Sequence, residues 1–348
     1  MSFYGGEALL NFKLIKETVK YVRQQNPAVE FVLTTNLTLM TKEIADFFVK
    51  NNFHVGVSLD GPAFIHDKYR ITKNNEKTHD VILKNLEIIK SIDQNYFFNK
   101  ITFMCVLAPH EYNLNSLDEY FSNEPPFRDF SLARFKINVV NSEINTFEKD
   151  NNYSEFYKRF NTFAFEKFIN AHIHKKTDFS DMKATYICCV DGFKRILYRN
   201  PIKMDEFSYF WPNGACIPGL RSLYVSSDGN LYPCESLYDH NTFSIGDVES
   251  GINIQKIANL VEEYCKETVD YCKDCWAYRF CGSCFTSALI ENGKYSHEKK
   301  KANCESRKSG ILQSFKDFLT VIDKNPTAFD YLTLEDKPVN FANMNSDD

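Results

Sequence analysis

The chain has 348 residues, of which 43% are apolar and 25% charged, and its net charge is −5. This composition fits a globular protein of one or two domains, and no basic excess points to a nucleic-acid partner. No apolar run approaches the roughly 20 residues of a membrane helix, and no secretory signal opens the chain. We therefore expect no membrane contact and a reducing, cytoplasmic location, where clustered cysteines bind metal more often than they form disulfides.

Strands alternate with helices along the first 140 residues. Apolar, β-branched runs predict strands at 2–4, 29–34, 54–59, 100–107 and 134–140, and helical spacing predicts helices at 11–25, 42–52, 78–95 and 114–121. This alternation predicts an α/β fold with parallel strands joined by crossover helices. In such folds binding and catalytic residues lie at the carboxyl ends of the strands, so we look for the site there.

The pattern changes near residue 201. Helices are expected at 144–175 and 182–199, and turns and cysteines follow them. The Asp228-Gly229 turn predicts a β-hairpin between 223–226 and 231–233. Further helices are expected at 253–267 and 313–323, with a loose tail at the end. We therefore predict an α/β domain over 1–200, a cysteine-rich domain over 201–310, and a C-terminal helix and tail over 311–348.

Seven of the 11 cysteines form one spaced pattern: Cys216-x12-Gly229-x4-Cys234, Cys272-x2-Cys275-x5-Cys281-x2-Cys284, and Cys304. Thiolates hold zinc or iron–sulfur clusters. A zinc ribbon separates its two pairs by roughly 15–20 residues, whereas five residues separate Cys275 from Cys281. Seven ligands suit two clusters whose ligands interleave, and zinc stays as the alternative. The other cysteines are expected to be core thiols: Cys105, Cys188, Cys189 and Cys265.

This cysteine pattern closely resembles the SPASM domain, the twin [4Fe-4S] extension of many radical S-adenosylmethionine (SAM) enzymes. The chain departs slightly, because only Gly282 and Ser283 precede the sixth cysteine where the family often has three residues. The run from Cys275 to Gly282 is similar to that of peptide-modifying members.

The resemblance implies two auxiliary clusters. Family ligand order assigns one set of cysteines to the second cluster: Cys272, Cys275, Cys281 and Cys304. It assigns Cys216, Cys234 and Cys284 to the first cluster, which leaves that cluster one ligand short. Some relatives supply a cysteine where this chain has Ser222. The fourth site would then be open, or filled by Cys188, Cys189 or a substrate thiolate.

Three N-terminal turns resemble radical SAM turns and occur in the family order. The first is Gly5-Gly6-Glu7, followed by Ala8 where the family usually has Pro, and the second is Thr35-Asn36-Leu37-Thr38, with Leu37 where the family usually has Gly. The third is Ser58-Leu59-Asp60-Gly61-Pro62, continuing through His66-Asp67 to Arg70. By this resemblance the backbone of Gly5 and Gly6 and the carboxylate of Glu7 accept from the SAM amino group. Ser58 and Asp60 would face the ribose, and Arg70 would form a fork with the SAM carboxylate. The strand at 134–140 would flank the adenine. Taken one by one, these residues also read as turn formers and a surface charge.

The family fold would be a partial (β/α)6 radical SAM barrel followed by a small SPASM domain with a β-hairpin. In the family a C-x3-C-x2-C motif ahead of the GGE turn holds the SAM-cleaving cluster, and this chain has no cysteine before Cys105. Three hypotheses follow: a truncated reading frame, a second chain that completes the barrel, or a non-catalytic relative. No catalytic residue is assigned.

The favoured functional interpretation is a radical SAM/SPASM enzyme that modifies a ribosomally made precursor peptide, through thioether cross-links from cysteine thiols to carbon. A sulfatase-maturating enzyme, which forms formylglycine, is the alternative within the class. From another class, an iron–sulfur scaffold subunit that presents a peptide to a partner fits the same residues.

Overall fold

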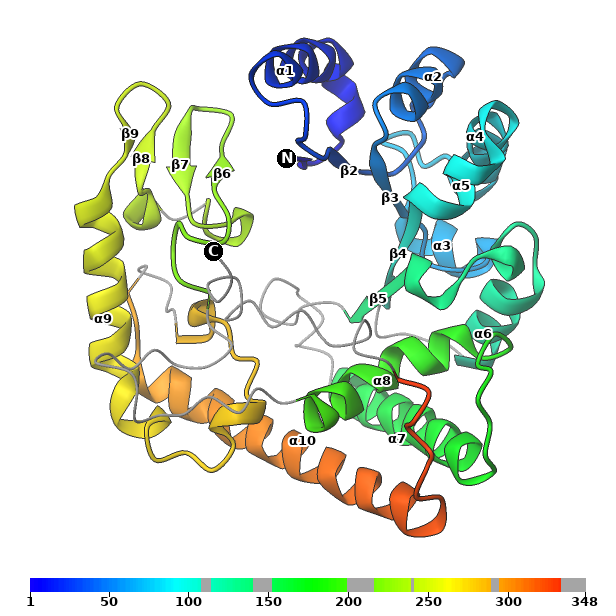
Figure 1. Cartoon of the computed structure of the whole chain (residues 1–348), viewed down its shortest axis with the longest axis vertical. Coiled ribbons are helices and arrows are strands. Elements are labelled where there is room, and N and C mark those ends of the chain that lie inside the picture. The colour runs from blue at the N-terminus through cyan, green and yellow to red at the C-terminus, as the bar shows by residue number, and fades with distance from the viewer. Residues whose placement is uncertain (108–113, 140–151, 199–215, 239–240, 289–293, 333–348) are drawn as a thin grey trace. The chain divides into compact units, whose positions relative to one another are not determined.

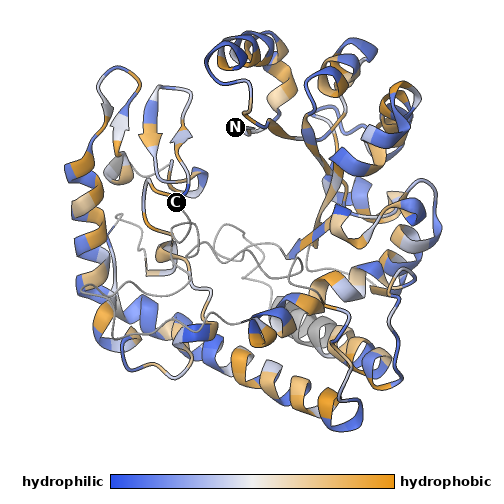
Figure 2. Cartoon of the chain, in the orientation of Figure 1, coloured by the Kyte–Doolittle hydropathy of each residue, from blue (hydrophilic) through white to orange (hydrophobic). Residues whose placement is uncertain are grey.

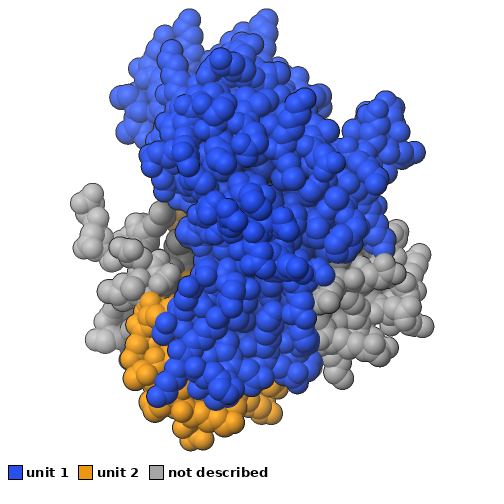
Figure 3. Space-filling model, turned by 90° about the vertical axis from the view of Figure 1, so that its right-hand side faces the viewer, with its two compact units in different colours: residues 1–190 blue, residues 191–348 orange. Residues whose placement is uncertain are grey.

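The computed structural model describes the chain except for residues 108–113, 140–151, 199–215, 239–240, 289–293 and 333–348. The expected start of the helix at 144–175 and most of the expected tail lie outside the described residues. Contacts divide the chain into two units, residues 1–190 and 191–348 (Figure 3). Within the described ranges, none of the helices combines the length and apolar character that crossing a membrane requires.

The first unit is built on a five-stranded parallel sheet (Figure 1). Its strands pair in chain order: β1 (Ser2–Phe3), β2 (Val32–Thr35), β3 (His54–Ser58), β4 (Ile101–Leu107) and β5 (Phe135–Val139). Each strand is parallel to the next, with Val57 opposite Phe103 and Phe103 opposite Phe135. The predicted α/β fold with a parallel sheet is confirmed.

Helices connect the strands, and those that follow β1, β2 and β3 lie on the same side of the sheet (Figure 1). The helices of this unit are α1 (Phe12–Gln25), α2 (Lys42–Lys50), α3 (Ala63–Tyr69), α4 (His79–Ile92), α5 (Gln94–Lys100), α6 (Leu114–Asn123), α7 (Asn152–Ile173) and most of α8 (Lys183–Leu197). The helix predicted over 78–95 is confirmed as α4, but it ends at Ile92 because Asp93 has an extended backbone and its side chain caps α5 at the N–H of Tyr96.

Apolar side chains between the sheet and its helices form the core of the first unit. The largely apolar strands β3 and β4 contribute Val55, Val57 and Phe103, each at most 1% exposed (Figure 2). The rings of Phe31 and Phe53 stack with centroids 5.3 Å apart, and Phe53 also stacks on Phe48 of α2. Burial of these side chains provides the main stabilisation of the fold.

The second unit carries a four-stranded antiparallel sheet and two long helices. Its elements are β6 (Tyr224–Val225), β7 (Asn230–Tyr232), β8 (Gly246–Asp247), β9 (Gly251–Ile252), α9 (Ile254–Cys272) and α10 (His297–Lys324). Strands β6 and β7 form the predicted hairpin, and Gly229 takes the left-handed φ of +84° that its turn requires. The last helix begins well before the predicted residue 313, because Ser296 caps it at the N–H of Lys299.

Lys183 is a buried cation that ties α8 to the loop ahead of β5. Its side chain is 1% exposed, and its Nζ donates to the carbonyl oxygens of Phe127, Arg128 and Phe130 at 2.7, 3.0 and 2.8 Å. The three ammonium hydrogens thus meet three acceptors. The lysine therefore replaces water as the partner of three carbonyls that the fold turns inward.

We expect Lys183→Met to lower the free energy of unfolding by about 2–3 kcal/mol, because the methionine fills the space but leaves buried carbonyls without donors. Urea denaturation followed by circular dichroism measures this change. Lys84→Met, on the exposed side of α4, is the matched control and should change stability by less than about 0.5 kcal/mol. Equal effects of the two substitutions would contradict the assigned role.

Candidate functional site

Glu7 joins the first two of the three family-like turns. Its Oε1 accepts from the N–H of Leu9 at 3.0 Å and from the hydroxyl of Thr35 at 2.7 Å, and its Oε2 accepts from the N–H of Asn36 at 2.8 Å. These bonds bring the ends of β1 and β2 together. The carboxylate expected to meet a SAM amino group therefore also has a structural role within the chain, and its contact with SAM stays a prediction.

Leu37 occupies the position where the family motif usually has glycine. Its φ of +60° lies in the left-handed region that side chains disfavour. Its side chain is fully buried, and Asn85 Nδ2 donates to its carbonyl at 2.9 Å. Burial and this hydrogen bond offset the backbone cost, so the turn keeps its shape without glycine.

Asp60 connects three segments at the carboxyl end of the sheet. The guanidinium of Arg70 donates to both carboxylate oxygens, with 3.1 Å from Nη2 to Oδ1, and the N–H of Val106 donates to Oδ1 at 2.8 Å. Sequence reasoning expected Arg70 to form its fork with a SAM carboxylate. In the structure that fork engages Asp60, so a role toward SAM would require Arg70 to share its donors.

Gly61 follows Asp60 and has to be glycine. Its φ is +120°, and a Cβ there would lie 2.6 Å from Cδ2 of Leu117. Only glycine accepts both this backbone conformation and the close approach of α6. The glycine thus sets the direction in which the chain leaves β3 toward α3.

His66 and Asp67 lie on α3 and connect it by hydrogen bonds to the end of β3 and the start of α4. The N–H of Asp60 donates to His66 Nδ1 at 3.2 Å, and His66 Nε2 lies 3.0 Å from the hydroxyl of Thr78. That hydroxyl donates to the carbonyl of Arg70, so His66 carries its proton on Nε2. Burial lowers the pKa of His66 to about 4, against the opposing charge of Asp60.

Asp67 caps the start of α4. Its Oδ1 accepts from the N–H groups of Thr78 and His79, both at 3.0 Å. The His66-Asp67 pair therefore has a structural explanation that the sequence motif alone did not provide.

The remaining predicted SAM residues leave space at the same edge of the sheet. A Cβ on Gly5 or Gly6 would meet no atom within 4 Å, and both glycines are exposed. Ser58 ends β3, and no side-chain partner for it is found in the described ranges. It lies in one cross-strand row with Met104 and Lys136. Lys136, an exposed cation, was missed by sequence reasoning, although its place in an alternating strand is a usable signal.

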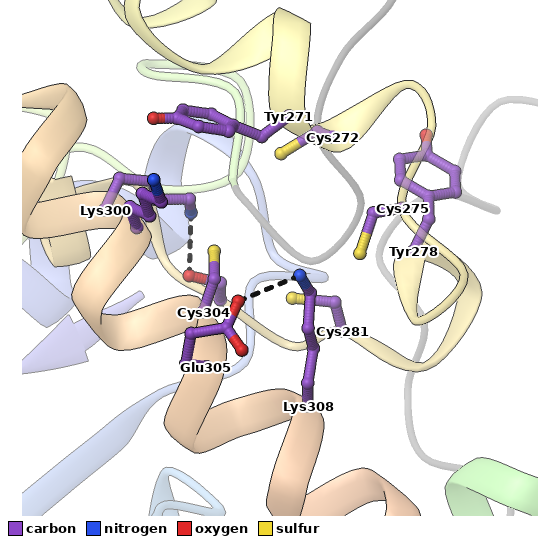
Figure 4. A pocket seen from close by; sticks show the side chains of 11 residues that line it. Tyr271, Cys272, Cys275, Tyr278, Cys281, Lys300, Cys304, Glu305 and Lys308 are labelled. Carbon is purple, nitrogen blue, oxygen red and sulfur yellow. Dashed lines mark hydrogen bonds and ion pairs between the residues drawn. The ribbon is translucent and has the colours of Figure 1, made fainter.

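Four cysteines of the second unit direct their sulfur atoms into one cavity of about 110 Å³ (Figure 4). Cys272 ends α9, Cys275 and Cys281 lie in the loop that follows, and Cys304 lies on α10. The other lining residues are Tyr271, Tyr278, Ser283, Lys300, Lys301, Glu305 and Lys308. The structure therefore brings together the four cysteines that the family order groups in one set.

Burial affects the protonation of two of these thiols, Cys272 and Cys304. It raises the pKa of Cys272 to about 11 and also raises the pKa of Cys304, while the charge of Lys300 opposes both shifts. Binding of a soft metal would release these protons, since the thiolate is the ligand. Across the described residues, no three His, Cys, Asp or Glu side chains converge as a site for a single metal ion. A cavity lined by four thiols has the donor set of an iron–sulfur cluster.

The other three cysteines of the pattern pack against one apolar core. Cys216, Cys234 and Cys284 contact the core formed by residues such as Leu237 and Tyr264. Ser222, at the position where some relatives have a cysteine, donates to the carbonyl of Pro233 at 2.6 Å, directly before Cys234. A hydroxyl thus lies near the incomplete ligand set, although the structure gives it a backbone partner.

Cysteines outside the pattern behave largely as core residues. Cys105 and Cys189 are each 1% exposed, and burial raises the pKa of Cys105 well above its usual range. Cys188 and Cys265 are half-buried. Neither Cys105 nor Cys189 has the exposure of a reactive thiol.

Comparisons with known proteins agree with this geometry. Residues 1–113 match the model of the radical SAM superfamily. A cysteine-type anaerobic sulfatase-maturating enzyme of Clostridium novyi is 28% identical over 292 residues, 81% of this chain and 71% of that enzyme. The radical SAM cyclopropyl synthase TigE of Paramaledivibacter caminithermalis is 28% identical over 68% of this chain and 43% of the synthase.

A solved structure, native anSMEcpe with bound AdoMet and Cp18Cys peptide, has a similar fold. It matches with a TM-score of 0.61 and 21% identity over 94% of this chain and 84% of that chain. The resemblance to radical SAM/SPASM proteins is thereby confirmed, and this chain is related to the radical SAM maturases.

We expect His66 to make stability depend on pH. Its folded pKa of about 4 lies below the ordinary value of 6.5, so its contribution is complete above pH 6.5 and is lost as the pH falls toward 4. The loss amounts to about 3 kcal/mol, because each pKa unit corresponds to about 1.4 kcal/mol. His66→Gln keeps a donor and an acceptor but does not titrate, so urea denaturation at several pH values should give a flatter curve. The exposed His174 provides the control, and His174→Gln should retain the wild-type slope.

Proposed function

We propose that this chain is a radical SAM/SPASM maturase that modifies a cysteine side chain of a peptide or protein substrate. The observation that carries the proposal is the cavity into which Cys272, Cys275, Cys281 and Cys304 direct their sulfurs, in a chain related to cysteine-type sulfatase-maturating enzymes. A site of this kind suits electron transfer beside a radical reaction.

Two auxiliary [4Fe-4S] clusters are part of the proposal. The four cysteines of the cavity would hold the second cluster, and Cys216, Cys234 and Cys284 would hold the first. When bound, such clusters supply one-electron transfer and, at an iron without a protein ligand, a place for a thiolate. The core packing of the three-cysteine set and the cavity of the four-cysteine set support this division.

The proposed SAM site is the carboxyl edge of the parallel sheet, formed by Gly5, Gly6, Glu7, Ser58, Asp60 and Arg70. Together with a reduced [4Fe-4S] cluster, bound SAM supplies a hydrogen-abstracting radical in this family. The sequence has no cysteine before Cys105 to match the family motif for that cluster. The residues that are present determine the conformation of this edge. Glu7 joins the first two turns by hydrogen bonds, and Asp60 orients the side chain of Arg70.

Two reactions on cysteine fit this site. In thioether formation, an S–H and a C–H bond are lost and an S–C bond forms, a net loss of two protons and two electrons for which SAM would be the electron acceptor. In formylglycine formation, the Cβ is oxidised to an aldehyde, sulfur leaves as hydrogen sulfide and water supplies the oxygen, again with a net loss of two protons and two electrons for which SAM would be the electron acceptor. A first cluster with three cysteines favours thioether formation, because an open iron can take the substrate thiolate. The cysteine-type sulfatase-maturating relatives favour formylglycine.

An anaerobic iron and sulfide count on the reconstituted full chain tests the proposed clusters. We expect about eight iron and eight sulfide per chain, and Cys275→Ala should remove about four of each because one cluster loses a ligand. Cys265→Ala is the control, since Cys265 lies on α9 but does not line the cavity, and it should keep the wild-type count. Bound zinc without sulfide would contradict the proposed function.

Electron paramagnetic resonance (EPR) of the reconstituted chain distinguishes the two reactions. A synthetic peptide with a single cysteine should change the spectrum of the first cluster, because its thiolate would occupy the open iron. The same peptide with alanine in place of cysteine should leave the spectrum unchanged. A cysteine peptide that binds without any spectral change would show four protein ligands and would favour formylglycine formation.

A further inference from the structure

Lys300 is a buried cation in the second unit. It lies on α10 with 1% of its surface exposed. Its Nζ donates to the hydroxyls of Tyr264, Ser283 and Ser287 at 3.1, 2.8 and 3.3 Å. All three partners are neutral, so hydrogen bonding is satisfied while the charge is not balanced.

No carboxylate compensates this charge within the described part of the chain, where Lys300 forms no ion pair. The neighbouring Lys308 differs, because Glu305 accepts from it at 3.2 Å. Lys183 differs as well, because three carbonyl dipoles surround its ammonium. Burying an ammonium without a negative partner costs free energy, so an anion near Lys300 would stabilise the folded unit.

Candidates for that anion are the thiols of the cavity, because the carboxylate of Glu305, which also lines it, is paired with Lys308. Lys300 lines the same cavity as the four cysteines (Figure 4). Cys304 lies one turn further along α10, on the same face. Thiolates in this cavity would therefore provide the missing negative charge.

The hydroxyls around Lys300 also reach toward the other cysteine set. Ser283 and Ser287 lie 2.7 Å apart, and Ser287 donates to the carbonyl of Cys284 at 2.6 Å. These bonds fix the ammonium instead of leaving it on a flexible stem. A fixed charge acts on a neighbouring anion without reorganisation when that anion gains an electron.

We propose that Lys300 is the fixed counter-ion of the cluster held by Cys272, Cys275, Cys281 and Cys304, and that it raises the reduction potential of that cluster. The inference rests on the proposed function, which supplies the cluster. Reduction adds one negative charge to an anionic cluster, so a nearby ammonium stabilises the reduced state more than the oxidised one. Lys300 is thus a positioning and tuning residue rather than a ligand.

The test is an EPR-monitored redox titration of the reconstituted full chain, in which the signal absent from Cys275→Ala identifies the second cluster. Lys300→Met should keep the iron content and lower the ratio of reduced to oxidised second cluster at a fixed potential by about tenfold. For a one-electron couple this is a shift of about 59 mV to more negative values. Lys301→Met, an exposed neighbour that lines the same cavity, should change the ratio by less than about twofold, because water screens its charge.

Full iron content with a wild-type ratio in Lys300→Met overturns the inference and leaves the proposed function intact. A wild-type chain that forms no iron–sulfur cluster overturns both. Where Lys300→Met does not fold, Ser287→Asp provides the second test, since its carboxylate would neutralise Lys300 in place. It should shift the ratio in the same direction, and an unchanged ratio rejects the counter-ion role.

Discussion

The carboxylate of Asp60 is the interaction on which the carboxyl edge of the sheet depends. The carboxylate accepts from the side chain of Arg70 and from the backbone N–H of Val106, and the backbone N–H of Asp60 donates to Nδ1 of His66. It is 8% exposed, so little water competes for these bonds. Strands β3 and β4 and the loop before α4 therefore meet at one point. Any ligand at this edge would bind to turns whose conformation is already fixed, which reduces the entropy lost on binding.

Much of this arrangement follows from local sequence, and the exceptions have physical causes. The strands at 54–58 and 101–107 were predictable because β-branched and apolar residues there bury on at least one face. The break at Asp93 was missed because an aspartate within a periodic apolar run looks like an exposed helix residue. The start of α10 was missed because residues 297–312 are mostly polar and carry a weak helical pattern.

The sequence predicted which kinds of residue form the site better than it predicted which residues contact one another. The family resemblance, rather than spacing alone, grouped the four cysteines that line the cavity, because Cys304 lies 20 positions beyond Cys284 at the end of the closely spaced run. The Asp60–Arg70 fork was not predicted, since the sequence does not say whether an arginine faces a neighbour or a ligand. Lys300 was overlooked for a similar reason, because a lysine in the run Lys299-Lys300-Lys301 is ordinarily exposed. Only the fold reveals that one of these three residues points inward.

The buried lysines Lys183 and Lys300 show that the two units accommodate a buried positive charge in different ways. In the first unit, backbone carbonyls receive the ammonium of Lys183, so the chain itself completes that site. In the second unit, hydroxyls receive the ammonium of Lys300, and the compensating charge has to come from deprotonated cysteines. Those thiols have a raised pKa while they carry protons, so charge balance and metal binding are coupled. A soft metal cluster would deprotonate the thiols, balance the lysine and link the end of α9 to α10 in one step. The stability of this unit and the electronic properties of its cluster should therefore depend on the same few residues.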